Sequence, residues 1–246
     1  MILKSLWSRA IEFYEQGATH TTESLNKPEM RIGIFGGSFD PPHLAHLKLL
    51  LELQKKFPLE RIWIVPSKYP PGKTAVASFE KRLSWCKRLF QGEDEGFKVS
   101  DFEKSTTTTL FGKDIYSHIS AVETENQKAI SFYWILGEDQ WTQLSFWKDI
   151  DSYGPQLGWI ILAREKSEND KTEYGFLSRR LQTKTCSYRF APIRNSLAEV
   201  SSTQIRKKLQ SNTHSMENAE PEISWIPEQI REDVFKEYQT AHEHEH

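Results

Sequence analysis

From about residue 31 onward, short apolar runs alternate with longer segments in which apolar residues recur at helical spacing. Apolar runs of about four to eight residues indicate buried strands, and an apolar residue at every third or fourth position indicates an amphipathic helix. We predict strands at 31–35, 61–66, 97–102, 130–136, 157–163 and 188–193. We predict helices at 42–56, 79–91, 109–122, 138–150, 174–182, 203–210 and 227–239.

This order of elements predicts the fold class. Nearly continuous apolar strands separated by helices are typical of a mostly parallel sheet with helices on both faces. With right-handed crossovers the result is a doubly wound, Rossmann-like α/β fold, completed here by C-terminal helices. Ligands of such folds bind at the carboxyl ends of the strands, so we look there for chemistry.

The N-terminal segment is set apart from this pattern. We divide the chain into 1–29, an amphipathic helix with a weakly structured linker at 21–29, and 30–246, the α/β domain with a charged surface loop at 165–173. We expect the first helix to dock on the domain, with attachment to a membrane surface as the alternative. No run reaches the length needed to span a bilayer. The helical spacing is carried by Ile2, Leu3, Leu6, Trp7, Ala10, Ile11 and Tyr14.

Composition narrows the class of protein. The chain has 246 residues, of which 37% are hydrophobic and 27% charged, as in globular proteins. A net charge of −2 argues against a broad nucleic-acid surface. Two cysteines, Cys86 and Cys186, argue against a disulfide framework and favour a reducing, cytoplasmic location. The sequence leaves open whether the chain forms a homo-oligomer.

The stretch "MRIGIFGGSFDPPHLAHLKLLLEL" joins the first strand to the first helix of the α/β domain. Gly36 and Gly37 lack Cβ atoms, so they permit a tight turn and a close approach of backbone N–H groups to a phosphate. Asp40 suits a helix N-cap, and Pro41 suits the first helical position, where its missing N–H costs nothing. The sequence therefore predicts a helix whose N-terminus faces a ligand.

Two histidines follow within the first turns of that helix. His43 and His46 are three residues apart, so they share one face of the helix near the positive end of its dipole, which favours anions. A glycine turn or a histidine pair alone is common in proteins of every kind. The ordered string is more specific and predicts a pocket for a nucleoside triphosphate.

These residues resemble the nucleotidylyltransferase superfamily, whose mark is a His-x-Gly-His helix start after a glycine turn. The string "GGSFDPPHLAHL" looks most like the nicotinate mononucleotide adenylyltransferases of NAD biosynthesis. Three later stretches are similar to motifs of that family in the same order: "VPSKYPPGK" (65–73), "FYWILGEDQWTQLSFW" (132–147) and "VSSTQIRKKL" (200–209). The resemblance runs from about residue 30 to 239.

The resemblance implies transfer of AMP from ATP to nicotinate mononucleotide, which gives nicotinate adenine dinucleotide and pyrophosphate. Mg²⁺ would arrive with ATP, because no cluster of side chains resembles a dedicated metal site. The partners would be the small-molecule substrates ATP and a pyridine mononucleotide. The attacking phosphate is already an anion, so the protein must orient two anions and stabilise the leaving group, and needs no enzyme nucleophile.

Site residues follow from the same resemblance. The catalytic set would be His43, His46, Lys73 and Arg206. ATP would contact both histidines, Arg206, Gly36, Gly37, Ser38, Ser202 and Thr203, and the acceptor would contact Asp139, Trp147 and Arg82. Each has an ordinary alternative: Ser201 with Gln204 forms a capping box, Lys73 is a solvated loop residue, Asp139 caps a helix, and Trp147 belongs to the core.

The chain departs from the family's pattern in three places. Ala45 stands where the family has glycine, and a methyl group there would crowd the adenine. Gly72 stands where histidine is usual, before Lys73. The segment 105–114 replaces a Ser-Tyr-Thr segment that helps hold the pyridine nucleotide, so the acceptor is less certain than ATP.

Other functions stay open on sequence alone. The acceptor could be nicotinamide mononucleotide, phosphopantetheine or a polyol phosphate. A non-catalytic nucleotide-binding or regulatory protein with the same fold is a different class. A dinucleotide-dependent oxidoreductase is disfavoured, because only Gly33, Gly36 and Gly37 occur near the first strand and the Gly-x-Gly-x-x-Gly spacing is absent.

Overall fold

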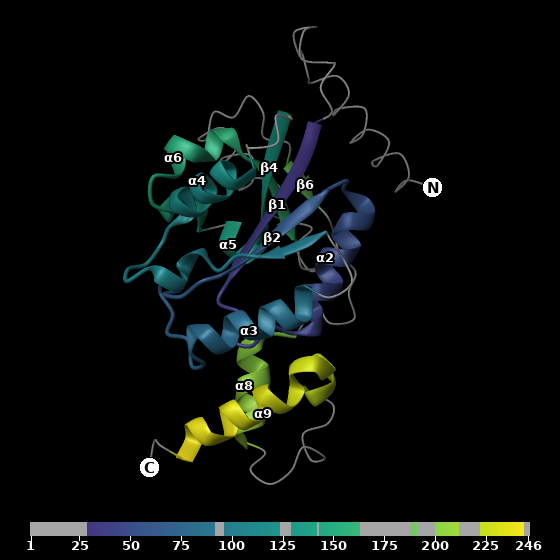
Figure 1. The fold of residues 1–246 in the computed structure, drawn as a ribbon, viewed down its shortest axis with the longest axis vertical. Coiled ribbons are helices and arrows are strands. Elements are labelled where there is room, and N and C mark those ends of the chain that lie inside the picture. Colours follow the sequence, from purple (N-terminus) through teal and green to yellow (C-terminus); the bar gives the residue numbers. More distant parts are fainter. Residues whose placement is uncertain are drawn as a thin grey trace, which may run out of the picture.

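A six-stranded parallel sheet forms the centre of the protein in a computed structural model (Figure 1). The structure describes residues 29–91, 96–123, 129–141, 143–162, 188–190, 200–211 and 222–243. The strand order is β3-β2-β1-β4-β5-β6, which is the order of doubly wound nucleotide-binding folds. The strands are β1 (Glu29–Gly37), β2 (Arg61–Pro66), β3 (Phe97–Val99), β4 (Ala129–Gly137), β5 (Gly158–Leu162) and β6 (Tyr188–Phe190).

Helices cover both faces of this sheet. The α-helices are α2 (Leu44–Lys56), α3 (Phe79–Phe90), α4 (Gly112–Glu123), α5 (Glu138–Trp141), α6 (Ile150–Tyr153), α8 (Ser202–Ser211) and α9 (Glu228–Glu243). Short 3-10 helices are η1 (Phe102–Ser105), η3 (Leu144–Phe146), η4 (Gly154–Gln156) and η6 (Glu222–Trp225). Helices α8 and α9 lie beyond α3 at one end of the molecule (Figure 1).

Alternation along the central strands separates two hydrophobic cores. In β4, Trp134 faces the core with α4 and α6, whereas its neighbour Ile135 faces the core with α2 and α3. In β1, Ile34 and Phe35 divide in the same way. Successive side chains of a strand point to opposite faces, so a continuous apolar run fills both cores.

A third core attaches the C-terminal helices to the domain. Trp85 of α3, Ile205 of α8 and Val234 and Tyr238 of α9 are fully or almost fully buried in it. Ion pairs between α3 and α9, Lys81 with Glu237 among them, lie at its edge. This packing places α8 next to the carboxyl ends of the strands.

The fold class is confirmed, and the differences from the predicted elements are local. The strand predicted at 97–102 ends at Val99, because Ser100 Oγ accepts a hydrogen bond from the Phe102 amide and starts η1. The helix predicted at 138–150 is divided among α5, η3 and the start of α6, with Asp149 in the left-handed region at φ 57°.

Several predicted segments lie outside the described residues. They are the N-terminal helix, the linker at 21–29 apart from Glu29, the loop at 165–173, the helix at 174–182 and residues 191–193. Among the residues that the structure does describe, no helix is long and apolar enough to cross a membrane.

Candidate active site

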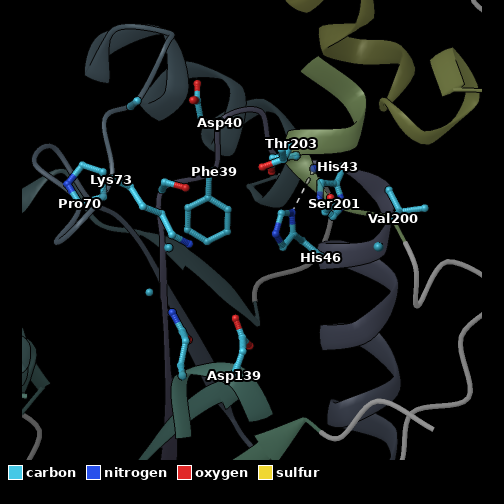
Figure 2. Close-up of a pocket in the computed structure, with 18 of the residues that line it drawn as sticks. Phe39, Asp40, His43, His46, Pro70, Lys73, Asp139, Val200, Ser201 and Thr203 are labelled. Carbon is cyan, nitrogen blue, oxygen red and sulfur yellow. Dashed lines mark hydrogen bonds between the residues drawn. The ribbon is translucent and has the colours of Figure 1, made fainter. Parts of the chain in front are cut away.

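A cavity of about 640 Å³ lies at the carboxyl ends of β1, β4 and β5. Gly37, Gly137 and Leu162 mark these three strand ends, and the N-terminal turns of α2 and α8 close the cavity from one side. Figure 2 shows His43, His46, Ser201 and Thr203 on that side, with Pro70 and Lys73 across from them. The volume is that of a typical small-molecule site.

The glycines of the opening motif end the first strand instead of forming a turn after it. Gly36 and Gly37 are the last residues of β1, paired with Val65 and Pro66. A Cβ atom at Gly37 would lie 3.3 Å from the ring of Phe39. The residue with positive φ is Phe39 itself, at 48°, a region that costs a non-glycine residue on the order of 1 kcal/mol or more.

Asp40 does not cap the helix, contrary to the sequence prediction. Helix α2 begins at Leu44, and Pro41 follows a cis peptide bond outside it. Asp40 is 2% exposed, and its carboxylate accepts hydrogen bonds from the amides of Val76 and Ala77. The carboxylate therefore binds the segment that precedes α3 and is not available to α2.

His43 takes the N-cap position instead, and the two histidines form a stacked pair. Their ring centroids are 3.7 Å apart, and the His43 amide donates to Nδ1 of His46 across 3.2 Å (Figure 2). A side chain three residues into the helix that accepts from the N-cap amide is one half of a capping box. Helix geometry therefore fixes the orientation of the His46 ring.

Burial keeps both rings neutral. It lowers the pKa of His46 to about 4, and it lowers the pKa of His43, on which His46 acts in the same direction. Because Nδ1 of His46 accepts a hydrogen bond, the neutral ring carries its proton on Nε2. His46 can therefore donate one hydrogen bond from Nε2 to an anion. Nδ1 of His43 is buried without a partner among the described residues.

The N-terminus of α8 supplies the second anion-binding element. Ser201 Oγ accepts from the Gln204 amide, and the Gln204 side chain accepts from the Ser201 amide, so the capping box considered from the sequence is present. This cap leaves the amides of Ser202 and Thr203 at the open start of the helix. Such amides, together with the helix dipole, favour a phosphate.

Side chains of α8 are tied to the loop that follows β1. Ser202 Oγ donates to the carbonyl of Pro41 across 2.8 Å, so its proton is not available for a phosphate. Arg206 donates to the carbonyl of Asp40 through Nη1 and to Thr203 Oγ1 through Nη2. The structure thus brings Thr203 and Arg206 to the same cavity as the two histidines.

Lys73 lies on the loop between β2 and α3, at the mouth of the cavity (Figure 2). The side chain is exposed, and Gly72 before it has φ 68°, where glycine is favoured. An exposed ammonium group at the mouth can approach phosphates that project from the cavity. Ser38 is half-buried in the cavity wall and is another of the predicted phosphate contacts.

The three predicted acceptor residues have different positions. Asp139 lines the cavity at the start of α5, after β4 (Figure 2). Trp147 is half-buried outside the cavity and packs edge-on against Trp134, with ring centroids 5.4 Å apart. Arg82 is also outside the cavity, and it is 1% exposed.

Arg82 is a structural residue in this arrangement, in contrast to the prediction that it contacts the acceptor. Its guanidinium donates to the carbonyls of Ser38, Ser67 and Ala77 at 2.5–3.0 Å. These carbonyls belong to the loop after β1 and to the loop that carries Lys73. Arg82 therefore joins the two loops through hydrogen bonds to backbone carbonyls, that of Lys68 included.

Ala45, which the sequence singled out, lies in the cavity wall with 9% exposure. Sequence reasoning did not identify several other cavity residues. Phe39 lies edge-on to His46, with ring centroids 5.2 Å apart. Leu49, Leu162 and Val200 form an apolar part of the wall. The only signal in the sequence is that Leu49 is one helical turn after Ala45 on the same face of α2.

No group of three or more His, Cys, Asp or Glu side chains that could hold a metal ion occurs within the described part of the chain. The carboxylate of Asp40 is already used by backbone amides, and Asp139 is a single carboxylate in the cavity. A divalent cation at this site would therefore have to bring most of its oxygen ligands with a phosphate.

Comparison with known proteins agrees with this geometry. The family model described as cytidylyltransferase-like matches residues 34–208, which is more than half of the chain. That range contains the loop after β1, both histidines, the Lys73 loop and most of α8. It ends before α9.

Curated relatives are similar over different lengths. A protein of Thermotoga maritima named "Probable nicotinate-nucleotide adenylyltransferase" is 36% identical over 129 residues, which cover 51% of this chain and 58% of that protein. A protein of the same name from Thermotoga sp. (strain RQ2) is 28% identical over 207 residues, covering 83% and 94%. The chain thus spans little more than half of the first relative and nearly all of the second.

A solved structure shows the same fold. The nicotinic acid mononucleotide adenylyltransferase of Plasmodium falciparum, complexed with NaAD, superposes with a TM-score of 0.64 at 19% identity. The superposition covers 86% of this chain and 97% of the other.

Proposed function

This chain belongs to the cytidylyltransferase-like family, and on that premise we propose that it is a nicotinate-nucleotide adenylyltransferase. It transfers AMP from ATP to nicotinate mononucleotide and releases pyrophosphate, a step of NAD biosynthesis. The names of its relatives support the choice of acceptor. The chemistry of the cavity supports the reaction type.

One observation carries this proposal. The N-termini of two helices far apart in sequence, α2 and α8, open onto one cavity that also holds His46 and Arg206. Helix N-termini, a neutral imidazole N–H and a guanidinium are donors without acceptors, which suits a polyanion of the size of a triphosphate. A hydrolase with a covalent intermediate would need an activated nucleophile, and the hydroxyls of the cavity residues Ser201 and Ser202 are hydrogen-bonded to Gln204 and Pro41, not to a histidine.

The reaction needs only orientation and charge stabilisation from the protein. A phosphate oxygen of the acceptor attacks the α-phosphorus of ATP, the bond between this phosphorus and the bridging oxygen to the β-phosphate breaks, and pyrophosphate leaves with the electron pair. His46 donates from Nε2 to an oxygen at the α-phosphate. Arg206, with the amides of Ser202 and Thr203, stabilises the charge that develops on pyrophosphate.

The remaining predicted residues have supporting roles. Lys73 approaches the phosphates from the mouth of the cavity, and the backbone at Gly36, Gly37 and Ser38 lies against them. Asp139 accepts a hydrogen bond from a ribose hydroxyl. Trp147 stacks on the pyridine ring at the edge of the site, which requires that the acceptor extends beyond the cavity toward α4.

Mg²⁺ enters with ATP in this proposal, because the site offers no group of protein ligands for it within the described residues. The cation would neutralise charge on the phosphates of ATP. Asp139 would be its carboxylate ligand from the protein, because the carboxylate of Asp40 already accepts from backbone amides. A cytoplasmic location, expected from the low cysteine count, is a further part of the proposal.

The test is a pyrophosphate-release assay with ATP and Mg²⁺. Nicotinate mononucleotide, nicotinamide mononucleotide and phosphopantetheine are compared at equal concentrations, and the product is identified by mass. We expect the largest kcat/KM with nicotinate mononucleotide. A larger value with another acceptor would keep the transferase and change its substrate, and ATP binding without release for any acceptor would reject catalysis.

A further inference from the structure

A buried carboxylate next to the cavity joins four parts of the chain. Asp40 Oδ2 accepts from the Val76 amide across 2.9 Å, and Oδ1 accepts from the Ala77 amide across 3.0 Å and from the Tyr238 hydroxyl across 2.6 Å. Nη1 of Arg206 lies 3.4 Å from Oδ2. The carboxylate is therefore shared between backbone amides, a phenol and a guanidinium.

Arg206 is held by this carboxylate on one side and faces the cavity on the other. Its Nη1 also donates to the backbone carbonyl of Asp40, and its side chain is 20% exposed. A guanidinium has five N–H donors in a fixed planar arrangement, so fixing one edge of the group directs the opposite edge. The Asp40 carboxylate thus helps to set, together with the Asp40 carbonyl and Thr203 Oγ1, which donors of Arg206 point at a bound phosphate.

Tyr238 reaches Asp40 from a distant part of the sequence. It lies in α9, where its side chain is fully buried, and its ring lies 6.1 Å from that of Trp85 in α3. The family model ends at residue 208, so α9 lies outside the matched range. The hydroxyl lines no part of the cavity, which rules out direct contact with a substrate there.

We propose that Tyr238 is a positioning residue for the reaction: its hydroxyl orients the Asp40 carboxylate, and the carboxylate orients Arg206 toward the triphosphate. This inference rests on the proposed function for the identity of the reaction. It also states, independently of the acceptor, that Tyr238 affects the affinity for ATP through Arg206. The C-terminal helix α9 is then part of the catalytic scaffold and not only a cover for α3 and α8.

The Asp40 carboxylate divides its charge among its hydrogen-bond donors. When the phenol donates to Oδ1, part of the charge of Asp40 is balanced by a neutral group in a buried place. Without the hydroxyl, the carboxylate keeps the two backbone amides, and Arg206 becomes its one remaining side-chain partner among those described above and is drawn toward it. The guanidinium then has less charge and fewer donors available for phosphate.

The matched variants are Tyr238→Phe and Tyr153→Phe. Both remove one hydroxyl from a buried tyrosine, but the hydroxyl of Tyr153 has no hydrogen-bond partner among the described residues. Tyr238→Phe should lower kcat/KM for ATP about tenfold and leave KM for the acceptor within about twofold. Tyr153→Phe should leave kcat/KM for ATP within about twofold.

A double-mutant cycle with Arg206→Ala separates positioning from a general structural effect. If Tyr238 acts through Arg206, then Tyr238→Phe should cost about tenfold in the wild-type background and less than about twofold in the Arg206→Ala background. Equal costs in the two backgrounds, or no cost in the wild type, would overturn the proposal. Assays are run at a temperature where near-ultraviolet circular dichroism shows each variant folded.

Calorimetry with a non-hydrolysable ATP analogue and Mg²⁺ repeats the cycle without an acceptor. The same pattern in Kd supports positioning even when no acceptor yields pyrophosphate, so failure of the proposed function and failure of this inference are told apart. Additive changes in Kd together with additive changes in turnover would reject the role of Tyr238.

Discussion

The backbone amide of His43 donates to Nδ1 of His46 across 3.2 Å, and the two rings stack with centroids 3.7 Å apart. Through this one contact, the start of helix α2 sets both the orientation and the tautomer of His46. The N–H at Nε2 is then free for a phosphate oxygen. This hydrogen bond therefore stabilises the start of α2 and also sets the tautomer that His46 uses toward phosphate. The effect on stability and the effect on turnover can be measured separately.

His46→Ala should lower turnover by on the order of 10²-fold or more, because it removes a donor to the transition state. His46→Gln is the control for the helix start, since glutamine at this position can still accept from the His43 amide. We expect Gln to restore stability but not turnover, measured by urea unfolding and pyrophosphate release. Turnover near that of the wild type in His46→Ala would remove His46 from the proposed role.

Stability should fall as the pH is lowered from about 6.5 to about 4. The pKa of His46 is lowered by burial to about 4 from 6.5, so between these values the unfolded chain binds a proton that the folded chain does not. The contribution of neutral His46 to the free energy of unfolding is complete above about pH 6.5 and is lost below about pH 4. The lowered pKa of His43 acts in the same direction.

Urea midpoints of the wild type and His46→Gln, measured from about pH 7 to about pH 4.5, check this. We expect the wild type to lose more stability than the variant over that interval. Parallel curves for the two proteins would show that His46 does not titrate with a lowered pKa.

Trp147→Ala should raise KM for the pyridine mononucleotide more than KM for ATP, if Trp147 stacks on the pyridine ring. The neighbouring Phe146 is the control, because it is 86% exposed and outside the cavity. Phe146→Ala should change neither KM by more than about twofold. Equal increases in both KM values in Trp147→Ala would assign its contacts with Trp134 to packing alone.

Arg82→Ala should lower stability, by about 3 kcal/mol or more, because it leaves buried carbonyl groups of two loops without a donor. Arg88→Ala on the same helix breaks only the exposed pair with Asp233 and should cost about 1 kcal/mol at most. Urea unfolding measures both. A raised acceptor KM in Arg82→Ala with unchanged stability would restore the predicted contact with the acceptor.

The fold class could be predicted from the sequence because a continuous apolar run indicates a strand that is buried on both faces. Runs such as 130–136 supply both cores of a two-sided sheet, and the six strands occur where continuous apolar residues predict them. The strand predicted at 97–102 is too long, because Ser100 Oγ accepts a hydrogen bond from the Phe102 amide just after β3 ends.

The site was predicted in part for the same reason. The spacing of three residues places His43 and His46 close together at the start of α2. Local spacing cannot reveal that Asp40 is buried against α9, a helix about 200 residues later in the sequence. Asp40 has the sequence context of an N-cap. The tertiary structure shows instead that its carboxylate oxygens accept hydrogen bonds from Val76, Ala77 and Tyr238. Arg82 was expected at the acceptor only because it matches an arginine of the family's pattern, whereas here backbone carbonyls hold its guanidinium in the interior.

The most direct test of the account is a crystal structure of the protein with a non-hydrolysable ATP analogue and Mg²⁺. We expect the triphosphate between the N-termini of α2 and α8, with one oxygen within hydrogen-bond distance of His46 Nε2 and others near Arg206. A triphosphate bound elsewhere, with His46 and Arg206 both free of it, would contradict the central claim.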